Sequence, residues 1–261
     1  MKDFLYLQVR DLPYFRGLLR SVESQYYQDI DLPSPTLDVG CGDGHFTQLT
    51  FDRKLEVGID PWWPPILEAG TRNVYDLLLQ TDGAKMPYPD ATFASAISNS
   101  VLEHIPHIDH VLAETARVLK PGATFAFCVP NHQFNPNLSI ARFFDRLGMK
   151  SLAESYRRFF TRIARHIHLD DPETWSARLA QAGFTVERYW HYFPPSALAV
   201  LEWGHFFGLP SLVTRKVFGR WILVRARWNL ALTMALIRPH ADIQPCNDGT
   251  CTFYIVRRIA S

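Results

Sequence analysis

The sequence predicts an α/β fold in which a parallel sheet carries helices on both faces. Short apolar runs alternate along the chain with amphipathic segments of helical period, which is the pattern of parallel strands joined by helices. Glycines follow the first apolar run directly, at positions 40, 42 and 44. At 261 residues the chain is long enough to bury one substantial core. The predicted strands are residues 36–39, 55–59, 74–80, 94–98, 124–129, 185–192 and 252–259.

Apolar residues at helical spacing predict the connecting helices. Residues 11–28 place Leu12, Phe15 and Leu18 on one face, which predicts an amphipathic helix before the first strand. Pro33 then ends the approach to that strand. Further helices are predicted at residues 46–51, 64–69, 110–119, 138–147, 151–165 and 173–182.

Three segments stand outside this regular alternation. We expect one domain over residues 1–261, without internal repeats, to which these segments are added. They are an N-terminal helical segment at 1–35, a polar and basic helical insertion at 132–171, and an aromatic and basic insertion at 194–245. The two insertions follow the fifth and sixth strands.

Composition excludes several classes of protein. With 27 basic and 26 acidic residues the net charge is +1, so the chain lacks the broad positive field of a nucleic-acid-binding protein. The N-terminus has no apolar run of the kind that secretion requires, which points to the cytoplasm. We therefore expect no structural disulfide among the four cysteines, although the turn between Cys246 and Cys251 would bring that pair close.

The loop after the first strand reads Asp38-Val39-Gly40-Cys41-Gly42-Asp43-Gly44. Glycines allow positive φ and let a ligand approach the backbone, and the following helix presents amide groups to an anion. Such a loop suits dinucleotides or adenosylmethionine. A dinucleotide loop needs a third small residue where His45 stands, so the spacing favours adenosylmethionine.

Two aspartates stand at the ends of the next two strands. Asp60 lies 16 positions beyond Gly44, where a carboxylate can accept both hydroxyls of a ribose. Asp82 follows the third strand, where a carboxylate can accept the exocyclic amine of adenine. Each alone is more often a strand-end cap. Together with Asp38 they place three acids along one edge of the sheet, where open α/β folds bind ligands.

These motifs resemble a known family. Residues 36–131 contain LDVGCGDG, VGID, TDGAKMPYPDATF, ISNSVLEHI and LAETARVLKPGATFAFCVPN, and this set is similar to class I S-adenosylmethionine-dependent methyltransferases of the type-11 family. The resemblance implies a Rossmann-like sheet of seven strands with an antiparallel last strand, into whose slot residues 252–259 fit. It also implies a transferase with S-adenosyl-L-methionine as cofactor.

The resemblance assigns the cofactor-binding residues. Gly40, Gly42 and Gly44 would hold the methionine part with Asp38 behind them, and Asp60 and Asp82 would bind ribose and adenine. Pro61 and Gly83 follow these two acids directly, and an adjacent Trp62 or Trp63 either stacks on adenine or gives simple hydrophobic cover. The expected set is Asp38, Gly40, Gly42, Gly44, Asp60, Pro61, Asp82, Gly83, Asn99 and Ser100.

Methyl transfer is an in-line displacement that requires alignment and no metal, and no metal-ligand cluster is visible in the sequence. A hydroxyl acceptor would need a general base, for which histidine is suited. His104 and His132, which follow the fourth and fifth strands, are the candidate catalytic residues. Arg165, His166 and His168 are candidates for the acceptor pocket, with a solvated cluster as the alternative.

The two insertions indicate the acceptor and the partners. Residues 142–165 carry seven basic residues against two acids, which favours an anionic acceptor or, equally, a solvated helix face. Residues 194–245 interleave Trp and Arg with apolar runs too short to span a membrane, which suits peripheral membrane contact, a homodimer interface or a pocket lid. No nucleic-acid partner is expected.

We therefore expect an O-methyltransferase that acts on a small-molecule, glycan or lipid-linked acceptor. A ubiquinone- or menaquinone-type C-methyltransferase is the first alternative, because those enzymes share the motif set. A non-catalytic adenosylmethionine-binding protein is the second, although the retained acids at 38, 60 and 82 argue against it.

Overall fold

The computed structural model describes residues 2–259, and contacts between residues divide the chain into two compact units. The sheet unit comprises residues 30–132, 164–190 and those from 251 onward. The helical unit comprises the residues up to 29 together with 133–163 and 191–250. The helical unit is thus built almost wholly from the three segments that the sequence sets apart. A single domain over the whole chain stays a prediction.

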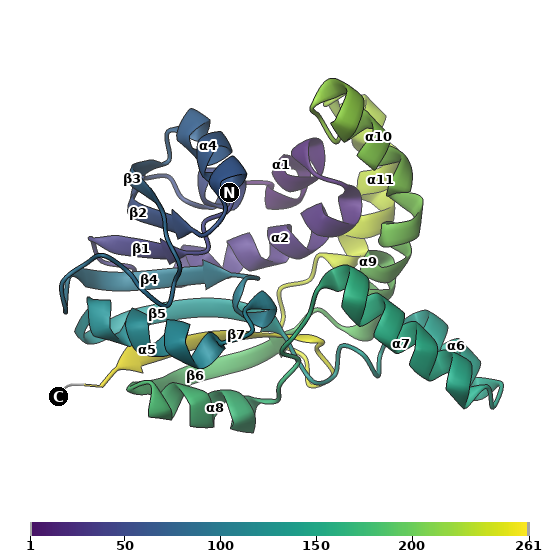
Figure 1. The fold of residues 1–261 in the computed structure, drawn as a ribbon. Coiled ribbons are helices and arrows are strands. Elements are labelled where there is room, and N and C mark those ends of the chain that lie inside the picture. The colour runs from purple at the N-terminus through teal and green to yellow at the C-terminus, as the bar shows by residue number, and fades with distance from the viewer. Residues whose placement is uncertain (1, 260–261) are drawn as a thin grey trace. The chain divides into compact units, whose positions relative to one another are not determined.

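Seven strands form the sheet unit's centre. They are β1 (Thr36–Val39), β2 (Leu55–Asp60), β3 (Tyr75–Gln80), β4 (Phe93–Asn99), β5 (Leu119–Pro130), β6 (Phe184–Tyr192) and β7 (Cys251–Arg258). Their order across the sheet is β3-β2-β1-β4-β5-β7-β6 (Figure 1). Strands β1 to β5 pair in parallel, and β7 runs antiparallel to β5. This confirms the predicted seven-stranded sheet with an antiparallel last strand.

The fifth strand begins earlier than the sequence predicts. Leu119 already pairs with Phe93, whereas the next paired residue, Thr124, meets Ser95, so the register shifts between the two. Residues 120–123 take up the extra length, and Gly122 adopts a φ of +76° there. Pro121 and Gly122, which lie between the predicted helix and the predicted strand, are therefore part of an irregularity at the start of the strand.

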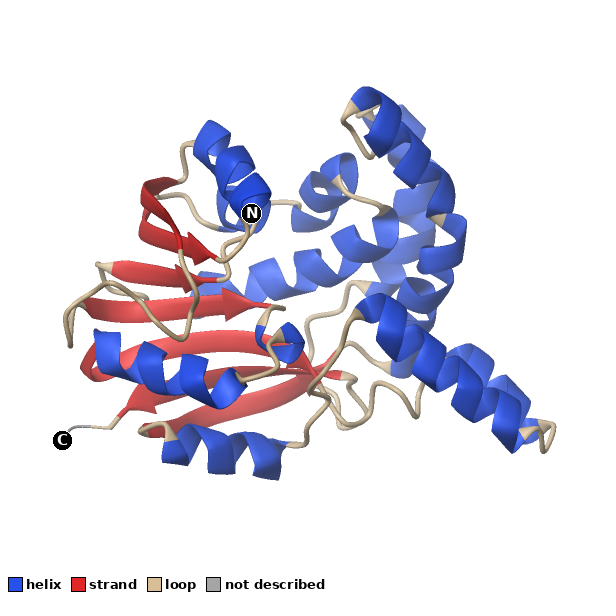
Figure 2. Cartoon of the chain, in the orientation of Figure 1, coloured by secondary structure: helices blue, strands red, loops and turns tan. Residues whose placement is uncertain are grey.

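Helices flank the sheet (Figure 2). The sheet unit contains α3 (His45–Thr50), α4 (Trp63–Arg72), the 3-10 turn η2 (Leu102–His104), α5 (Ile108–Val118) and α8 (Pro172–Gln181). Their ends follow from local chemistry. The carboxylate of Asp171 caps α8 by accepting from the Thr174 amide at 2.8 Å, and Pro172 fits the first turn because it needs no donor there.

Aromatic side chains fill the core between α8 and the sheet. Phe127 on β5 lies 4.8 Å from the ring centre of Tyr254 on β7 and 5.3 Å from that of Trp175 on α8. All three are fully buried. Large aromatic rings bury more apolar surface per residue than other side chains do. These contacts therefore hold β7 and α8 against β5.

The helical unit carries the remaining helices. They are α1 (Phe4–Asp11), α2 (Tyr14–Tyr26), η1 (Tyr27–Asp29), α6 (Ser139–Arg146), α7 (Lys150–Ala164), α9 (Pro195–Phe207), α10 (Leu209–Phe218), α11 (Arg227–Ile237) and η3 (Arg238–His240). The helical insertions after β5 and β6 are thereby confirmed. The single helix predicted at 11–28 was wrong at its start. Pro13 disfavours helical backbone at Leu12, so one helix ends at Asp11 and another begins at Tyr14.

A buried carboxylate joins two helices of this unit. Glu202 on α9 is fully buried, and it accepts hydrogen bonds from the amides of Ser139 and Ile140 and from the Ser139 hydroxyl at 2.6–3.1 Å. Those amides are the first of α6 and have no partner within the helix. Glu202 therefore caps α6 from a distant position in the sequence and compensates its own desolvation with charge-assisted bonds.

Two sequence predictions concern what the fold lacks. All four cysteines are free thiols, as expected. Between residues 2 and 259, no helix is both long enough and apolar enough to cross a membrane.

Candidate cofactor and active site

The strand order reverses between β1 and β4, and the predicted site residues gather at the carboxyl ends of the strands around that point. The glycine loop follows β1, Asp60 ends β2, Asp82 follows β3, and Asn99 ends β4. In open α/β sheets this reversal opens a crevice between the connections to either side, and ligands bind there. The structure therefore brings the predicted cofactor residues to one edge of the sheet unit.

The backbone amides of Gly40, Cys41, Gly42 and Gly44 bond within the protein. The amides of Gly40 and Cys41 both donate to the carbonyl of Ile59 at 2.9 Å. The Gly42 amide donates to the Asp60 carboxylate at 3.0 Å, and the Gly44 amide donates to the carbonyl of Cys41 at 3.1 Å. The chain uses these four amides to fix the loop's shape. Binding of an anion at the N-terminus of α3 stays a prediction.

The three loop glycines have different roles, although each has positive φ. A Cβ at Gly40 would lie 2.4 Å from a methyl carbon of Val101, and one at Gly44 would lie 3.3 Å from three side-chain atoms. A Cβ at Gly42 would meet no atom within 4 Å. Packing therefore demands glycine at 40, whereas at 44 a side chain would be tightly packed and its backbone strained by the positive φ. Gly42 faces open space, which is what close approach of a ligand requires, so this loop fits the cofactor.

Asp38 lies buried beneath the loop. Its Oδ2 atom lies 2.6 Å from the Tyr75 hydroxyl on β3 and 2.8 Å from the Thr47 hydroxyl on α3. The two hydroxyls are 2.7 Å apart. Burial, with the charge of Asp38 next in effect, raises the pKa of Tyr75 well above its usual range. Tyr75 thus stays neutral and remains a donor to the carboxylate.

Asp60 supports the loop from the neighbouring strand. Its Oδ2 accepts from the Gly42 amide at 3.0 Å, and its Oδ1 accepts from the Trp62 amide at 2.9 Å. Each carboxylate oxygen has two acceptor positions, so both retain one for a ribose hydroxyl. Burial raises the pKa of Asp60, against the lowering effect of these two amides. The indoles of Trp62 and Trp63 are exposed, and their stacking on adenine stays a prediction.

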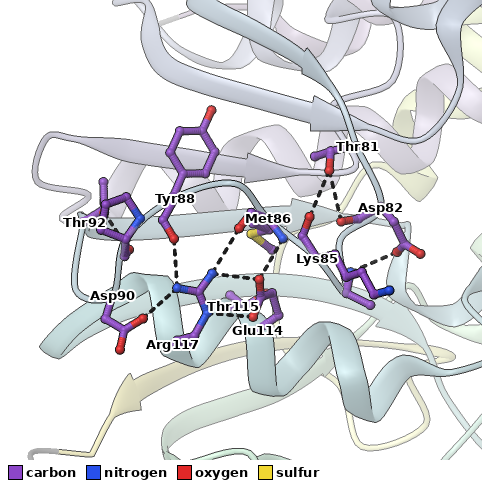
Figure 3. Close-up of polar contacts among 12 residues, drawn as sticks. Thr81, Asp82, Lys85, Met86, Tyr88, Asp90, Thr92, Glu114, Thr115 and Arg117 are labelled. Atoms are coloured by element: carbon purple, nitrogen blue, oxygen red, sulfur yellow. Dashed lines mark hydrogen bonds and ion pairs between the residues drawn. The ribbon is translucent and has the colours of Figure 1, made fainter.

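Asp82 lies on a loop that is tied to α5 (Figure 3). Its own carboxylate accepts from the Ala84 amide at 2.9 Å, which holds a tight turn past Gly83. Further along, Arg117 on α5 donates to the carbonyls of Met86 and Tyr88 at 3.0 and 2.8 Å. Sequence reasoning missed this clamp.

Arg117 also makes two ion pairs, one with Asp90 of the loop and one with Glu114 on its own helix. It lies 2.7 Å from Asp90 and 2.8 Å from Glu114, and Glu114 in turn accepts from the Met86 amide at 2.7 Å (Figure 3). The hydrogen bond from Arg117 lowers the pKa of Glu114, and Glu114 raises that of Arg117. Both groups therefore stay charged at neutral pH. The spacing of Glu114 and Arg117 on one helix face is the signal that could have identified the pair.

The segment after β4 lies against the glycine loop, because Val101 contacts the Cβ position of Gly40. The buried Asn99 accepts from the Cys128 thiol at 3.1 Å, while Ser100 adopts a φ of +51°. Pro61, at the end of β2, accepts from the Gln80 side chain through its carbonyl at 3.1 Å. Their contact with cofactor stays a prediction.

The structure brings His104 together with the predicted acceptor loop. His104 Nδ1 lies 2.9 Å from the carbonyl of Arg165, and its ring stacks on that of His166 with centres 5.7 Å apart. The amides of Ile167 and His168 both donate to the Glu103 carbonyl, at 2.8 and 3.1 Å. Because a carbonyl can only accept, His104 Nδ1 must carry the proton, which makes Nε2 the accepting nitrogen.

The other predicted catalytic and acceptor-site residues have different roles. His168 Nε2 bonds the carbonyl of Ile105 at 2.9 Å, and its Nδ1 lies 3.6 Å from Asp170, so this residue fastens the loop to the turn η2. Arg165 contributes its carbonyl, at a φ of +58°, to the contact with His104. His132 is exposed and contributes to lowering the pKa of Asp171, after the bonds from Thr174. No group of three potential metal ligands occurs among residues 2–259.

The glycine loop yields a first prediction. Gly42→Ala should keep the fold, since the new methyl meets no protein atom, but it should weaken binding of S-adenosylhomocysteine by at least about tenfold. Titration calorimetry measures the affinity. Gly122→Ala is the matched control, because Gly122 also has positive φ and open surroundings but lies at the start of β5. Equal affinity in both variants would contradict a ligand at Gly42.

The Arg117 clamp yields a second prediction. Arg117→Met should reduce the free energy of unfolding by about 1–2 kcal/mol and weaken cofactor binding, because the loop that carries Asp82 loses its tie to α5. Urea unfolding and calorimetry measure the two effects. Arg257→Met breaks a surface pair with Glu187 and should leave affinity unchanged. An Arg117 variant that binds as tightly as the wild type would show that the clamp is not needed.

A third prediction follows from the raised pKa of Asp60. Protonation removes acceptor positions that the ribose needs, so affinity for S-adenosylhomocysteine should fall as pH drops, and at a higher pH than an ordinary aspartate would give. Calorimetry between about pH 8 and pH 4.5 measures this dependence. Asp60→Asn should bind more weakly and with a flatter profile. A wild-type affinity that is constant over the range would rule out this role.

Comparison with known proteins finds similarity to methyltransferases. A family model described as a methyltransferase domain matches residues 37–127. A trans-aconitate 2-methyltransferase of Methylobacterium nodulans is 31% identical over 243 residues, which cover 87% of each chain. One of Sinorhizobium fredii is 32% identical and covers 66% of this chain and 68% of its own length.

Two further similarities are more distant. A ubiquinone/menaquinone biosynthesis C-methyltransferase of Burkholderia cenocepacia is 27% identical over 59% of this chain and 69% of its own. A solved structure from Thermotoga maritima, described as a SAM-dependent methyltransferase and possible histamine N-methyltransferase, aligns with a TM-score of 0.55. It shares 15% identity over 92% of this chain and 89% of its own, which shows the fold alone. The chain belongs to the class I S-adenosylmethionine-dependent methyltransferases.

Proposed function

We propose that this methyltransferase transfers its methyl group to an oxygen of a small anionic acceptor, with polycarboxylic acids as the leading class. The main support for this proposal is the similarity, over 87% of each chain, to a protein named for trans-aconitate. The excess of basic over acidic residues between positions 142 and 165 of the sequence is consistent with a negatively charged acceptor. A glycan or lipid-linked acceptor stays a prediction from the sequence.

Binding of the donor would use the crevice at the sheet edge. Gly42 leaves room beside the backbone, and Asp60 and Asp82 offer carboxylate oxygens from the two neighbouring strand ends. S-adenosylmethionine supplies an electrophilic methyl group on a sulfonium. Because the amides of Gly40, Cys41, Gly42 and Gly44 already bond within the protein, recognition of this donor relies on shape and on side-chain acceptors. The chain then aligns the reactants instead of activating the methyl.

His104 distinguishes two kinds of oxygen acceptor. A hydroxyl must lose its proton during transfer, and Nε2 of His104 is the nitrogen able to accept it. A carboxylate is already ionised at neutral pH and needs no base. For a carboxylate acceptor His104 would only help to position the substrate, with Glu103 Oε1 3.6 Å from its Nε2.

Two other functions remain candidates. The similarity to a quinone-pathway C-methyltransferase supports transfer to carbon. A non-catalytic adenosylmethionine-binding protein would keep the crevice and lack the acceptor reaction. The nature of the new bond separates these candidates, because a methyl ester is cleaved by mild base and a carbon-bound methyl is not.

The fourth prediction tests the acceptor class. The purified chain, S-adenosylmethionine with a labelled methyl group, and a panel of di- and tricarboxylic acids that includes trans-aconitate should give labelled methyl esters in mass spectrometry. Label that survives mild base would overturn transfer to a carboxylate. A chain that binds the donor but labels nothing, including quinone precursors and hydroxylated acids, would support the non-catalytic alternative.

His104→Ala refines the same experiment. With a carboxylate acceptor, kcat should change little, whereas with a hydroxyl acceptor it should fall by about a hundredfold or more. His110→Ala, an exposed histidine on α5, is the matched control. A large loss in His104→Ala on a carboxylate would contradict its limited role there.

A further inference from the structure

A long stretch of the helical unit contains no acidic residue. Between Glu202 and Asp242, the chain has basic residues and no Asp or Glu. We call residues 203–241 the acid-free segment. It includes the end of α9, all of α10 and α11, and η3. Its cations are Arg215, Lys216, Arg220, Arg225, Arg227 and Arg238.

Helix α11 is apolar on both of its faces. Leu230, Met234 and Ile237 are buried, and the helix packs on α1 and α2. The opposite side of α11 carries Trp228, Leu232 and Leu236, whose side chains are 75%, 73% and 65% exposed. A surface helix of a water-soluble protein normally shows polar residues on its outer side, and one that is apolar all round is normally covered. The outer face of α11 therefore indicates a partner.

Helix α10 repeats this feature more strongly. None of its residues is buried, and it exposes large apolar side chains along its length. The exposed set is Leu209, Leu212, Val213, Val217 and Phe218. Both helices are light green in Figure 1 and have only 10 and 11 residues, which is too short to span a bilayer. Such helices lie in the plane of a membrane surface when they bind one.

The charge of the acid-free segment indicates which kind of partner covers the exposed faces of α10 and α11. Arg225 and Arg238 pair with Asp11 and Asp3, which anchor the segment to the N-terminal helix. The segment itself holds no acid to balance its other cations. A twofold dimer through this surface would place cations against cations, because the same patch meets itself. A negatively charged surface is complementary instead.

Tryptophan and arginine favour lipid over an acidic protein. The segment contains Trp203, Trp221 and Trp228, and the guanidinium of Arg215 lies 5.9 Å from the ring centre of Trp221. Indole rings prefer the boundary between headgroups and acyl chains, and arginine reaches lipid phosphates from apolar surroundings. Basic residues beside apolar faces are the pattern of peripheral anchors on anionic bilayers.

We propose that the acid-free segment docks this methyltransferase on anionic phospholipid surfaces. The outer faces of α10 and α11 enter the headgroup boundary, and the cations of the segment other than Arg225 and Arg238 meet lipid phosphates. The proposal does not depend on which acceptor is methylated.

Vesicle flotation with the full-length chain tests the docking. Vesicles of phosphatidylcholine with about 30% phosphatidylglycerol should bind the protein at low salt, and pure phosphatidylcholine should bind it at least about tenfold more weakly. Raising the salt to about 0.5 M should release much of the bound protein. A wild-type chain that ignores anionic vesicles at low salt, or binds both compositions equally, overturns the proposal.

Paired variants locate the contact. Trp228→Ser with Leu232→Ser should reduce binding at least about tenfold, and Lys216→Glu with Arg220→Glu should abolish the preference for anionic lipid. Leu67→Ser with Leu77→Ser, which are exposed leucines of the sheet unit, and Arg146→Glu with Arg162→Glu are the matched controls. Unchanged affinity for S-adenosylhomocysteine confirms that each variant is folded.

Two results would assign the surface differently. Loss of vesicle binding in the controls but not in the segment variants would place the contact elsewhere and overturn the proposal. A dimer seen by light scattering that dissociates in Trp228→Ser with Leu232→Ser, without vesicle binding by the wild type, would make a second copy the occupant.

Discussion

The buried carboxylate of Asp38 holds together the elements on which the cofactor crevice depends. It belongs to β1, and it bonds hydroxyl groups that come from α3 and from β3. A buried charge is costly unless hydrogen bonds replace its hydration, so the carboxylate stabilises the fold only while both hydroxyls remain in place. The strand before the glycine loop, the helix after it and a strand two positions away in the sheet are therefore fixed together.

This constraint is reinforced by bonds within the glycine loop. The amides of Gly40, Cys41, Gly42 and Gly44 bond to Ile59, Asp60 and Cys41, and these bonds favour one loop shape before a ligand binds. The open side of Gly42 then defines where a ligand approaches. A rigid loop of this kind pays little ordering entropy on binding, which is the physical basis of preorganised recognition.

Much of this arrangement could be predicted from the sequence, because it depends on local pattern. Apolar runs placed the strands, and strand order together with the positions of Asp60 and Asp82 indicated a common edge. The single helix predicted at 11–28 was wrong at its start, although Pro13 in the sequence indicated a helix boundary there. The tie between Arg117 and residues about 30 positions earlier could not be predicted, since it requires knowing which face α5 presents to the loop. The same holds for Glu202, which caps a helix more than 60 residues away.

The histidines show the same limit at the active site. Sequence spacing identified His104, His166 and His168 as candidates but could not separate their roles, because these depend on backbone carbonyls that the fold brings to them. A crystal structure with bound S-adenosylhomocysteine would show whether the donor occupies the crevice beside Gly42. We expect the ligand at the carboxyl ends of β1, β2 and β3, with its ribose at Asp60. A ligand bound elsewhere, or a crevice left empty at saturating concentration, would contradict it.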